Sequence, residues 1–294
     1  MKPKRLLLLG LLYSLSITYG QNYKVITDIT YAEEPTSSKQ KLDIYIPEGN
    51  GLMPCLVWIH GGAWLAGSKD GLAKEIDTVL HHGYVVVSIG YRLSSEAIFP
   101  AQIHDCKTAI RFLKANGTKY YIDSSRIAVA GASAGGHLVS LLGTSAGIEV
   151  LEGRDLGYGN VSSRVHAVID YYGPTNFLIM DDLPEKCENA MVHLTSNSPE
   201  SLLLGCNIEE CPEKVKTANP ITYISEDDPP FLIFHGTFDC TVTPKSSILL
   251  QKALQSNDIR EELHLLSGAG HGGEQFLRAE IKEQVLQFLN SNLK

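Results

Sequence analysis

Three short segments rich in small residues carry side chains that could together cleave an acyl bond. Ser133 lies in Gly-Ala-Ser-Ala-Gly, Asp239 ends His-Gly-Thr-Phe-Asp, and His271 lies in Gly-Ala-Gly-His-Gly-Gly. A serine hydroxyl attacks a carbonyl carbon once a base removes its proton, and an imidazole oriented by a carboxylate is a suitable base. We therefore predict Ser133 as nucleophile, His271 as its base and Asp239 as the acid that orients the base.

The surroundings of Ser133 indicate a sharp turn between a strand and a helix. An apolar run at 127–130 precedes the serine, and residues 134–142 follow with the apolar spacing of a helix. Glycines two positions to either side allow this tight turn, and the chain order serine, acid, histidine fits it. Three other carboxylates compete for the role of the acid but lie too early in the chain or before their strand: Asp170, Asp227 and Asp228.

The segment His60-Gly61-Gly62-Ala63-Trp64 could supply an oxyanion hole. It follows an apolar run at 55–59, and its small residues let backbone N–H groups approach a tetrahedral intermediate. The expected donors are the N–H groups of Gly62, Ala63 and Ala134, each worth about 3 kcal/mol to the oxyanion. This chemistry needs no metal and no cofactor, and the sequence has no H-E-x-x-H spacing, dinucleotide fingerprint or Walker sequence.

Alternating strand and helix patterns predict the α/β fold class, with a mostly parallel central sheet flanked by helices. Nearly continuous apolar runs, typical of strands covered on both faces, occur at 55–59, 84–89, 127–130, 167–171 and 231–234. Helical patterns occur at 72–82, 101–116, 134–142, 244–255 and 274–293. Two alternating stretches at 24–31 and 41–46 are typical of antiparallel edge strands. Because parallel strands end at one edge of a sheet, the three chemical side chains should meet there.

We expect one domain behind a short leader. Lys2, Lys4 and Arg5 precede an apolar run that ends in small residues, so residues 1–20 are predicted to be a signal peptide. An uncleaved N-terminal anchor is the alternative. Residues 21–294 would form a single domain, in which the polar stretch at about 175–219 breaks the alternation and is interpreted as an inserted cap.

The charge of the chain argues against a nucleic-acid partner. The formal charge is −8, and loss of the three basic residues of the leader would make it −11. Such a chain repels phosphate backbones, and no run of Lys and Arg offsets this repulsion. No segment after the leader reaches membrane-spanning length, so we also expect no stable membrane insertion.

From about residue 23 to its end, the sequence resembles the bacterial feruloyl-esterase-like branch of the α/β-hydrolases, related to hormone-sensitive-lipase-type esterases. The resemblance is carried by His-Gly-Gly-Ala-Trp at 60–64, Tyr-Arg-Leu at 91–93, Phe-Pro-Ala-Gln at 99–102, the serine segment at 131–136, Asp-Asp-Pro-Pro at 227–230, His-Gly-Thr at 235–237 and Gly-His-Gly at 270–272. It implies an α/β-hydrolase fold that hydrolyses short acyl, acetyl or feruloyl esters, some of them on plant polysaccharide. Two positions depart from lipase relatives: Ala63 replaces a glycine, and Ala132 replaces an acid.

The expected activity is thus that of a secreted or periplasmic carboxylic ester hydrolase, with a small-molecule or polysaccharide-linked ester as its partner. Two other functions stay open at this point. A serine peptidase of the prolyl-oligopeptidase type has the same order of catalytic residues. A catalytically silent binding module could use the same fold, although such modules usually lose the serine or the histidine, both of which this chain retains.

The six cysteines are unevenly distributed. Cys55 and Cys106 lie in apolar surroundings and are expected to be buried thiols. The other four lie in the polar third quarter of the chain, where export would allow disulfides, and they permit three pairings. Short spacing and the family resemblance favour a bond between Cys206 and Cys211, which leaves Cys187 to pair with Cys240.

Overall fold

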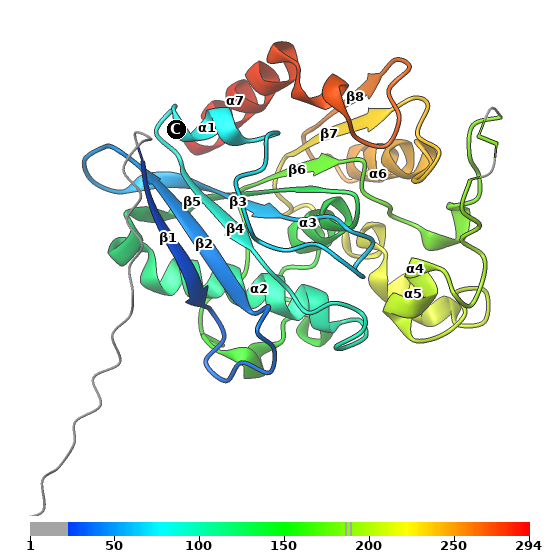
Figure 1. The fold of residues 1–294 in the computed structure, drawn as a ribbon, viewed down its shortest axis with the longest axis horizontal. Helices are drawn as coiled ribbons and strands as arrows, with labels where there is room; N and C mark the ends of the chain where they lie inside the picture. Colours follow the sequence, from blue (N-terminus) through cyan, green and yellow to red (C-terminus); the bar gives the residue numbers. More distant parts are fainter. Residues whose placement is uncertain (1–22, 186, 189) are drawn as a thin grey trace, which may run out of the picture.

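The computed structural model describes residues 23–185, 187–188 and 190–294, so the predicted signal peptide at 1–20 lies outside the described residues. Within the described chain, one eight-stranded sheet has the order β1-β2-β4-β3-β5-β6-β7-β8 (Figure 1). The first three strands in this order pair antiparallel and the others pair parallel. The strands are β1 (Tyr23–Thr30), β2 (Lys41–Pro47), β3 (Met53–Ile59), β4 (Val85–Ile89), β5 (Ile122–Ala132), β6 (Ala167–Tyr171), β7 (Phe231–Gly236) and β8 (Glu261–Leu266).

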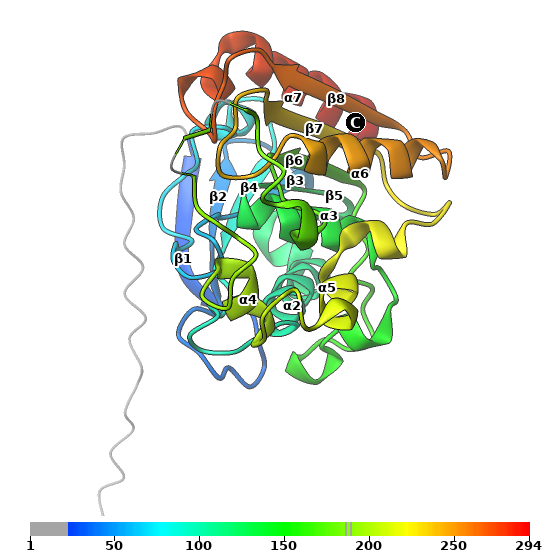
Figure 2. The ribbon, with the colours of Figure 1, turned by 90° about the vertical axis from the view of Figure 1, so that its right-hand side faces the viewer.

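Helices cover both faces of this sheet. The α-helices are α1 (Asp77–Leu80), α2 (Ala101–Asn116), α3 (Ala134–Thr144), α4 (Pro199–Leu204), α5 (Pro212–Ala218), α6 (Lys245–Gln255) and α7 (Ala279–Leu293). Short 3-10 helices are η1 (Gly117–Tyr120), η2 (Glu149–Leu151), η3 (Arg154–Leu156), η4 (Phe177–Ile179), η5 (Pro220–Tyr223) and η6 (Glu274–Leu277). Helices α1 and α7 lie on one face and α2, α3 and α6 on the other (Figures 1 and 2). The predicted α/β class, with its mostly parallel sheet between helices, is confirmed.

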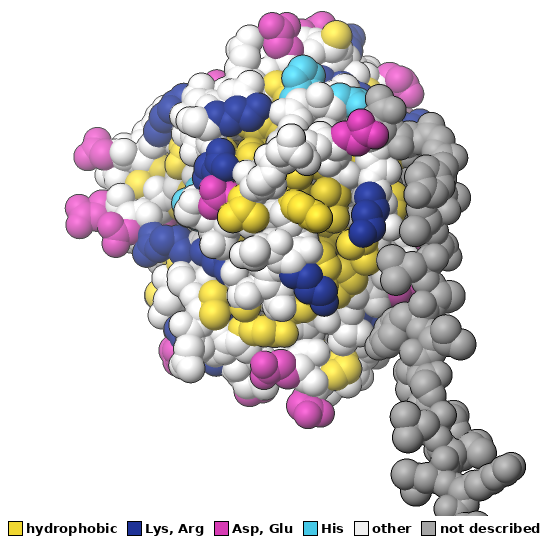
Figure 3. Space-filling model, turned by 90° about the vertical axis from the view of Figure 1, so that its left-hand side faces the viewer, with side chains coloured by type: hydrophobic (Ala, Val, Ile, Leu, Met, Phe, Trp, Pro, Cys, Tyr) yellow, Lys and Arg dark blue, Asp and Glu magenta, His cyan; other side chains and the backbone are white. Residues whose placement is uncertain are grey.

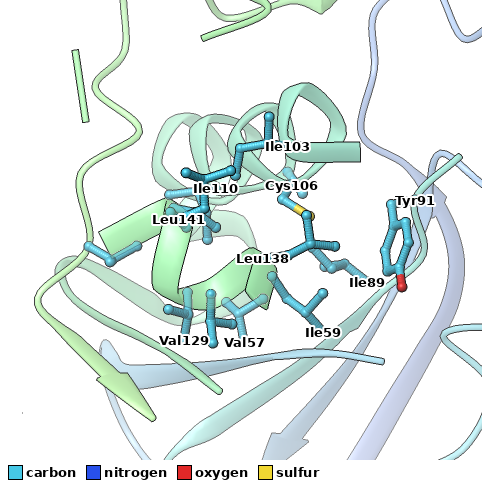
Figure 4. Close-up of a cluster of buried hydrophobic side chains, with 14 of the residues drawn as sticks. Val57, Ile59, Ile89, Tyr91, Ile103, Cys106, Ile110, Val129, Leu138 and Leu141 are labelled. Carbon is cyan, nitrogen blue, oxygen red and sulfur yellow. The ribbon is translucent and has the colours of Figure 1, made fainter. Parts of the chain in front are cut away.

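The two faces are built by the period-two alternation of strand side chains. In β3, Val57 and Ile59 point toward α2 and α3, whereas Leu56 and Trp58 belong to the cluster under α1 and α7. Burial of β3, β4, β6 and β7 on both faces explains why their sequences are nearly continuous apolar runs. Figure 4 shows the α2 and α3 side, where aliphatic side chains of the strands and of both helices interdigitate.

Two predicted helices differ from the structure. The helix expected at 72–82 is reduced to α1, because the preceding residues form tight turns in which Ile76 N–H donates to Ala73 O and Val79 N–H to Ile76 O. The helix expected at 274–293 is divided into η6 and α7 by Arg278, whose extended backbone (ψ 149°) starts α7 afresh. In both places the apolar residues have the spacing of a helix, but the backbone forms turns that bury the same side chains.

The chain between β6 and β7 contains the predicted cap region of about 175–219. It carries η4, α4 and α5 instead of a single long crossover helix, and it lies beside the carboxyl ends of the parallel strands (Figure 1). Two disulfides occur in this part of the molecule, Cys187–Cys240 and Cys206–Cys211, which is the pairing expected from the sequence. Cys55 and Cys106 are buried and unpaired.

The face at which the parallel strands begin is chemically mixed. Figure 3 shows Lys, Arg, Asp and Glu side chains scattered among hydrophobic ones on this side of the molecule, without a continuous block of one charge. Among the helices of the described residues, none is long and apolar enough to cross a membrane.

Candidate active site

Ser133 lies at the point where β5 turns into α3. Its backbone is strained, with φ 57° and ψ −119°, a conformation that a non-glycine residue rarely adopts. Its N–H donates to Tyr171 O at the end of β6 (2.9 Å), which fixes the turn against the neighbouring strand. The side chain is thereby held out of the sheet, at the N-terminus of α3.

Two glycines make this turn possible. A Cβ on Gly131 would lie 2.5 Å from Gly135 O, and one on Gly135 would strike the carbonyl oxygen of Ile59 in β3. Both contacts are with backbone atoms, which cannot move aside without displacing a strand or the helix. Close packing of strand, turn and helix therefore requires glycine two residues before and two residues after Ser133.

His271 and Asp239 reach Ser133 from the loops that follow β8 and β7. His271 Nε2 is 2.9 Å from Ser133 Oγ, and His271 Nδ1 is 2.7 Å from Asp239 Oδ2. Because a carboxylate only accepts hydrogen bonds, Nδ1 carries the proton and Nε2 presents a lone pair to the serine hydroxyl. The His271 side chain is 22% exposed and that of Asp239 is fully buried, so the predicted base is accessible and the predicted acid is enclosed.

Four donors surround the Asp239 carboxylate. Oδ1 accepts the N–H groups of Thr241 (2.8 Å) and Val242 (2.9 Å), and Oδ2 lies 3.3 Å from His235 Nε2 in addition to His271. Burial opposes ionisation, but hydrogen bonds from His235 and His271 outweigh it and hold the pKa of Asp239 well below its usual range. Asp239 is therefore a carboxylate throughout the neutral range.

His235 contributes to this site in a way that sequence reasoning missed. We expected it to brace a loop, and it does so: Nε2 also lies 2.9 Å from Val242 O, and Nδ1 lies 2.7 Å from Ser247 Oγ. Since both neighbours of Nε2 are acceptors, Nε2 carries the proton and Nδ1 accepts from Ser247. His235 lies near the end of β7 and Asp239 lies in the loop after it, so their spacing in the sequence does not predict the contact.

The oxyanion segment lies directly against the serine turn. A Cβ on Gly61 would be 2.6 Å from Ala132 O and 3.4 Å from Ser133 Cβ. Gly62, Ala63 and Trp64 all have positive φ (112°, 54° and 56°), which turns their peptide groups out of the strand direction. None of the hydrogen bonds within the described chain uses the N–H of Gly62, Ala63 or Ala134, so these expected donors are free for a ligand.

Trp64 anchors this segment. Its side chain is 2% exposed and packs edge-on against His137 of α3 (5.3 Å between ring centroids) and Phe177 of η4 (5.4 Å). The Gly62 carbonyl closes the turn by accepting the N–H groups of Leu65 and Ala66, both at 3.0 Å. An aromatic anchor buried between a helix and the cap region thus fixes the position of the free N–H groups.

The competing carboxylates lie elsewhere. Asp170 accepts hydrogen bonds from Gly173 N–H (2.8 Å) and Ser140 Oγ (3.0 Å), and burial raises its pKa to about 6. Asp227 is exposed, and Asp228 accepts hydrogen bonds from Ser225 within its own turn. None of the hydrogen bonds within the described residues joins these carboxylates to His271.

A doubly covered, mostly parallel sheet, with a serine turn after β5 and histidine and acid loops after β8 and β7, has the architecture of an α/β-hydrolase. The chain belongs to the BD-FAE family, whose model matches residues 42–254.

Known relatives agree with this family. The chain is 32% identical over 254 residues to Esterase LipC of Mycobacterium tuberculosis, covering 83% of this chain and 59% of LipC. It spans about half the length of the curated relatives that it matches.

Two solved structures are similar as well. A truncated carbohydrate esterase from gut microbiota has a TM-score of 0.84 at 30% identity, over 94% of this chain and 99% of that one. A bifunctional GH43-CE protein of Bacteroides eggerthii has a TM-score of 0.82 at 35% identity, over 92% of this chain and 35% of that one.

Proposed function

We propose that this protein is a serine esterase that hydrolyses carboxylic esters, with acyl groups on carbohydrate alcohols as its substrates. The observation that carries the proposal is the continuous hydrogen-bonded series from Ser133 through His271 to the ionised Asp239. The likeness to a carbohydrate esterase over nearly the whole chain supports the substrate class.

In the first half of the reaction, Ser133 Oγ attacks the ester carbonyl carbon while His271 Nε2 accepts its proton. The carbonyl oxygen becomes an oxyanion, which the N–H groups of Gly62, Ala63 and Ala134 bind, each contributing about 3 kcal/mol. Collapse of the tetrahedral intermediate breaks the bond to the alcohol oxygen, and His271 returns the proton to this leaving group. The product is an acyl-serine.

In the second half, water replaces the alcohol. His271 takes a proton from the water, the hydroxide attacks the acyl-serine, and the proton passes to Ser133 Oγ as the acid leaves. Asp239 remains ionised throughout: it holds His271 in the tautomer with its proton on Nδ1 and stabilises the imidazolium. The four donors to Asp239 keep this carboxylate fixed while the charge on the imidazole changes.

The test is a side-by-side assay of acetyl, butyryl, longer acyl and feruloyl esters together with a chromogenic peptide amide. We expect hydrolysis of short acyl or feruloyl esters and none of the amide. A phosphonate that reacts with activated serines should label Ser133, as determined by peptide mass spectrometry. Cleavage of the amide at a comparable rate would support a peptidase, and absence of both turnover and labelling would support a silent binding module.

We infer that the protein is exported and that residues 21–294 act as one domain with a cap at about 175–219. The signal-peptide layout of residues 1–20 and the two disulfides support export. A single sheet that continues through the described residues supports one domain. N-terminal sequencing of the protein recovered outside the cytoplasm tests the cleavage, which we expect after residue 20.

A further inference from the structure

Tyr172, the first residue after β6, has a conformation that needs an explanation. Its φ is 46°, which is uncommon for a bulky side chain, and its N–H donates to Phe234 O of β7 (2.8 Å). The neighbouring strands therefore hold the residue in this left-handed conformation. Backbone outliers of this kind concentrate at functional sites.

The ring of Tyr172 packs against the proposed base. Its centroid lies 4.7 Å from that of His271, at an interplanar angle of 62°, and 4.8 Å from that of Phe276. These two contacts form one wall beside the His271 imidazole. The loop that carries His271 is rich in glycine, so this aromatic wall restricts the orientation of a side chain whose own backbone restricts it little.

The hydroxyl of Tyr172 lies over the residue that follows the base. A Cβ on Gly272 would be 3.2 Å from Tyr172 Oη. Within the described residues Tyr172 Oη makes no hydrogen bond, and it is not among the fully enclosed atoms without a partner. The hydroxyl of the adjacent Tyr171 is in the opposite situation, because it is fully enclosed and has no partner. Of the two hydroxyls, only that of Tyr172 is not fully enclosed, in a residue that is 6% exposed.

The proposed reaction determines which part of the substrate lies beside Tyr172. His271 Nε2 delivers the proton to the leaving alcohol, so the alcohol must leave past His271, whereas the acyl group stays on Ser133. A polar atom beside His271 can therefore contact the alcohol. Burial, and next the charge of Glu75, raise the pKa of Tyr172 well above its ordinary value, so the hydroxyl stays protonated and able to donate.

We propose that Tyr172 is a specificity-determining residue of the leaving-group subsite, where its hydroxyl hydrogen-bonds a hydroxyl-bearing, sugar-like alcohol while its ring positions His271. This inference rests on the proposed esterase function and deepens it. An aryl alcohol without further hydroxyl groups makes no use of Tyr172 Oη. A site that offers an unpaired polar group to its ligand discriminates against ligands that cannot pair with it.

The experiment compares two acetyl esters, an acetylated methyl glycoside and phenyl acetate, which give the same acetyl-serine. The value of kcat/KM reports the steps up to release of the alcohol, so a difference between these esters reports the leaving group alone. For Tyr172→Phe we expect the ratio of kcat/KM for the glycoside to that for phenyl acetate to fall about five- to tenfold, the effect of one lost hydrogen bond. Tyr172→Ala should in addition lower kcat for phenyl acetate below the Tyr172→Phe value, because the wall beside His271 is lost.

Tyr171→Phe is the matched control, since it removes an enclosed hydroxyl from the adjacent position. Its ratio should equal that of the unchanged protein, and thermal melting shows whether each variant is folded. An unchanged ratio in Tyr172→Phe, or an equal fall in Tyr171→Phe, would overturn the inference. Hydrolysis of phenyl acetate without hydrolysis of the glycoside would overturn it and leave the esterase standing, whereas no hydrolysis of either ester would overturn the proposed function as well.

Discussion

At the level of single residues, the proposed reaction uses only the side-chain oxygen of Ser133. Its turn is fixed by backbone contacts and by the flanking glycines, so Ser133→Ala removes the nucleophile and almost no packing. We expect a loss of about five to six decades in kcat with an unchanged melting temperature. The measurement is ester hydrolysis against a mock purification. Residual turnover well above that background would show that another group attacks the ester.

Asp170 gives a second prediction, which concerns stability rather than activity. Its pKa is raised to about 6 by burial, above the value of about 4 of an unfolded aspartate. The folded protein therefore binds more protons than the unfolded chain between these values, so this residue makes stability fall as pH rises from about 4 to about 6. A pKa of about 6 in place of about 4 corresponds to about 3 kcal/mol of stability.

Asp170→Asn keeps the shape of the side chain and removes its titration. The free energy of unfolding of the variant, relative to the unchanged protein, should thus increase by up to about 3 kcal/mol between pH 4 and pH 7. Urea unfolding at both pH values measures this difference. Parallel stability curves for the two proteins would contradict the assignment of the raised pKa to Asp170.

Some residues of the site could be predicted from the sequence and others could not. The sequence predicts Ser133, Asp239 and His271 because each lies among small residues after an apolar run, and the ends of parallel strands bring such loops together. His235 and Tyr172 were not nominated as partners of the site. Their roles depend on the directions of their side chains. The positive φ of Tyr172 cannot be predicted from the local sequence Tyr-Tyr-Gly at 171–173.

At the scale of elements, the disulfide between Cys187 and Cys240 joins the cap region to the loop that carries Asp239. Cys187 and Cys240 are 53 positions apart in the sequence, whereas Cys206 and Cys211 are 5 positions apart. Closing the longer loop should stabilise the fold by about 4 kcal/mol, and loss of the bond should let Asp239 and His271 move from the serine.

We therefore expect the double variant Cys187→Ser, Cys240→Ser to lose about tenfold in kcat, in line with the sensitivity of catalysis to small displacements. The matched control is Cys206→Ser, Cys211→Ser, which removes a bond of similar chemistry away from the acid loop. Its kcat should change less than that of the first variant. Equal kcat values in both variants would mean that packing alone holds the acid loop.

The elements themselves were predictable wherever the hydrophobic pattern and the backbone agreed. Strands β3, β4, β6 and β7 and helix α2 match their predicted ranges closely, because a long apolar face of constant period permits few other structures. Strand β5 begins at Ile122, before its predicted range of 127–130, because its first residues are partly exposed and carry no apolar run. The helices predicted at 72–82 and 274–293 were wrong before α1 and around Arg278. Turns in these places bury the same apolar side chains as a helix would. The arrangement of α4 and α5 was not predictable, because short helices in a polar stretch carry little periodicity.

At the level of the whole molecule, the net charge of the chain should change the rate at which it encounters charged substrates. The formal charge is −8, and removal of residues 1–20 would make it −11. A protein of this charge repels an anionic ester during encounter, and salt screens the repulsion. The Debye length falls from about 30 Å at 10 mM salt to about 8 Å at 150 mM.

We expect kcat/KM for an ester of an acidic sugar to rise about twofold or more over this range of salt, whereas kcat/KM for an ester of the matching neutral sugar stays constant. Both are acylated with the same acid, so only the charge of the alcohol differs.

Three lysines near the oxyanion segment oppose this trend, because Lys39, Lys41 and Lys69 line a cavity of about 200 Å³ beside His60. Lys69 is already paired with Asp28, Asp43 and Asp70, which leaves the local field weak. A fall of kcat/KM with salt for the acidic ester would show instead that these lysines attract it and outweigh the net charge.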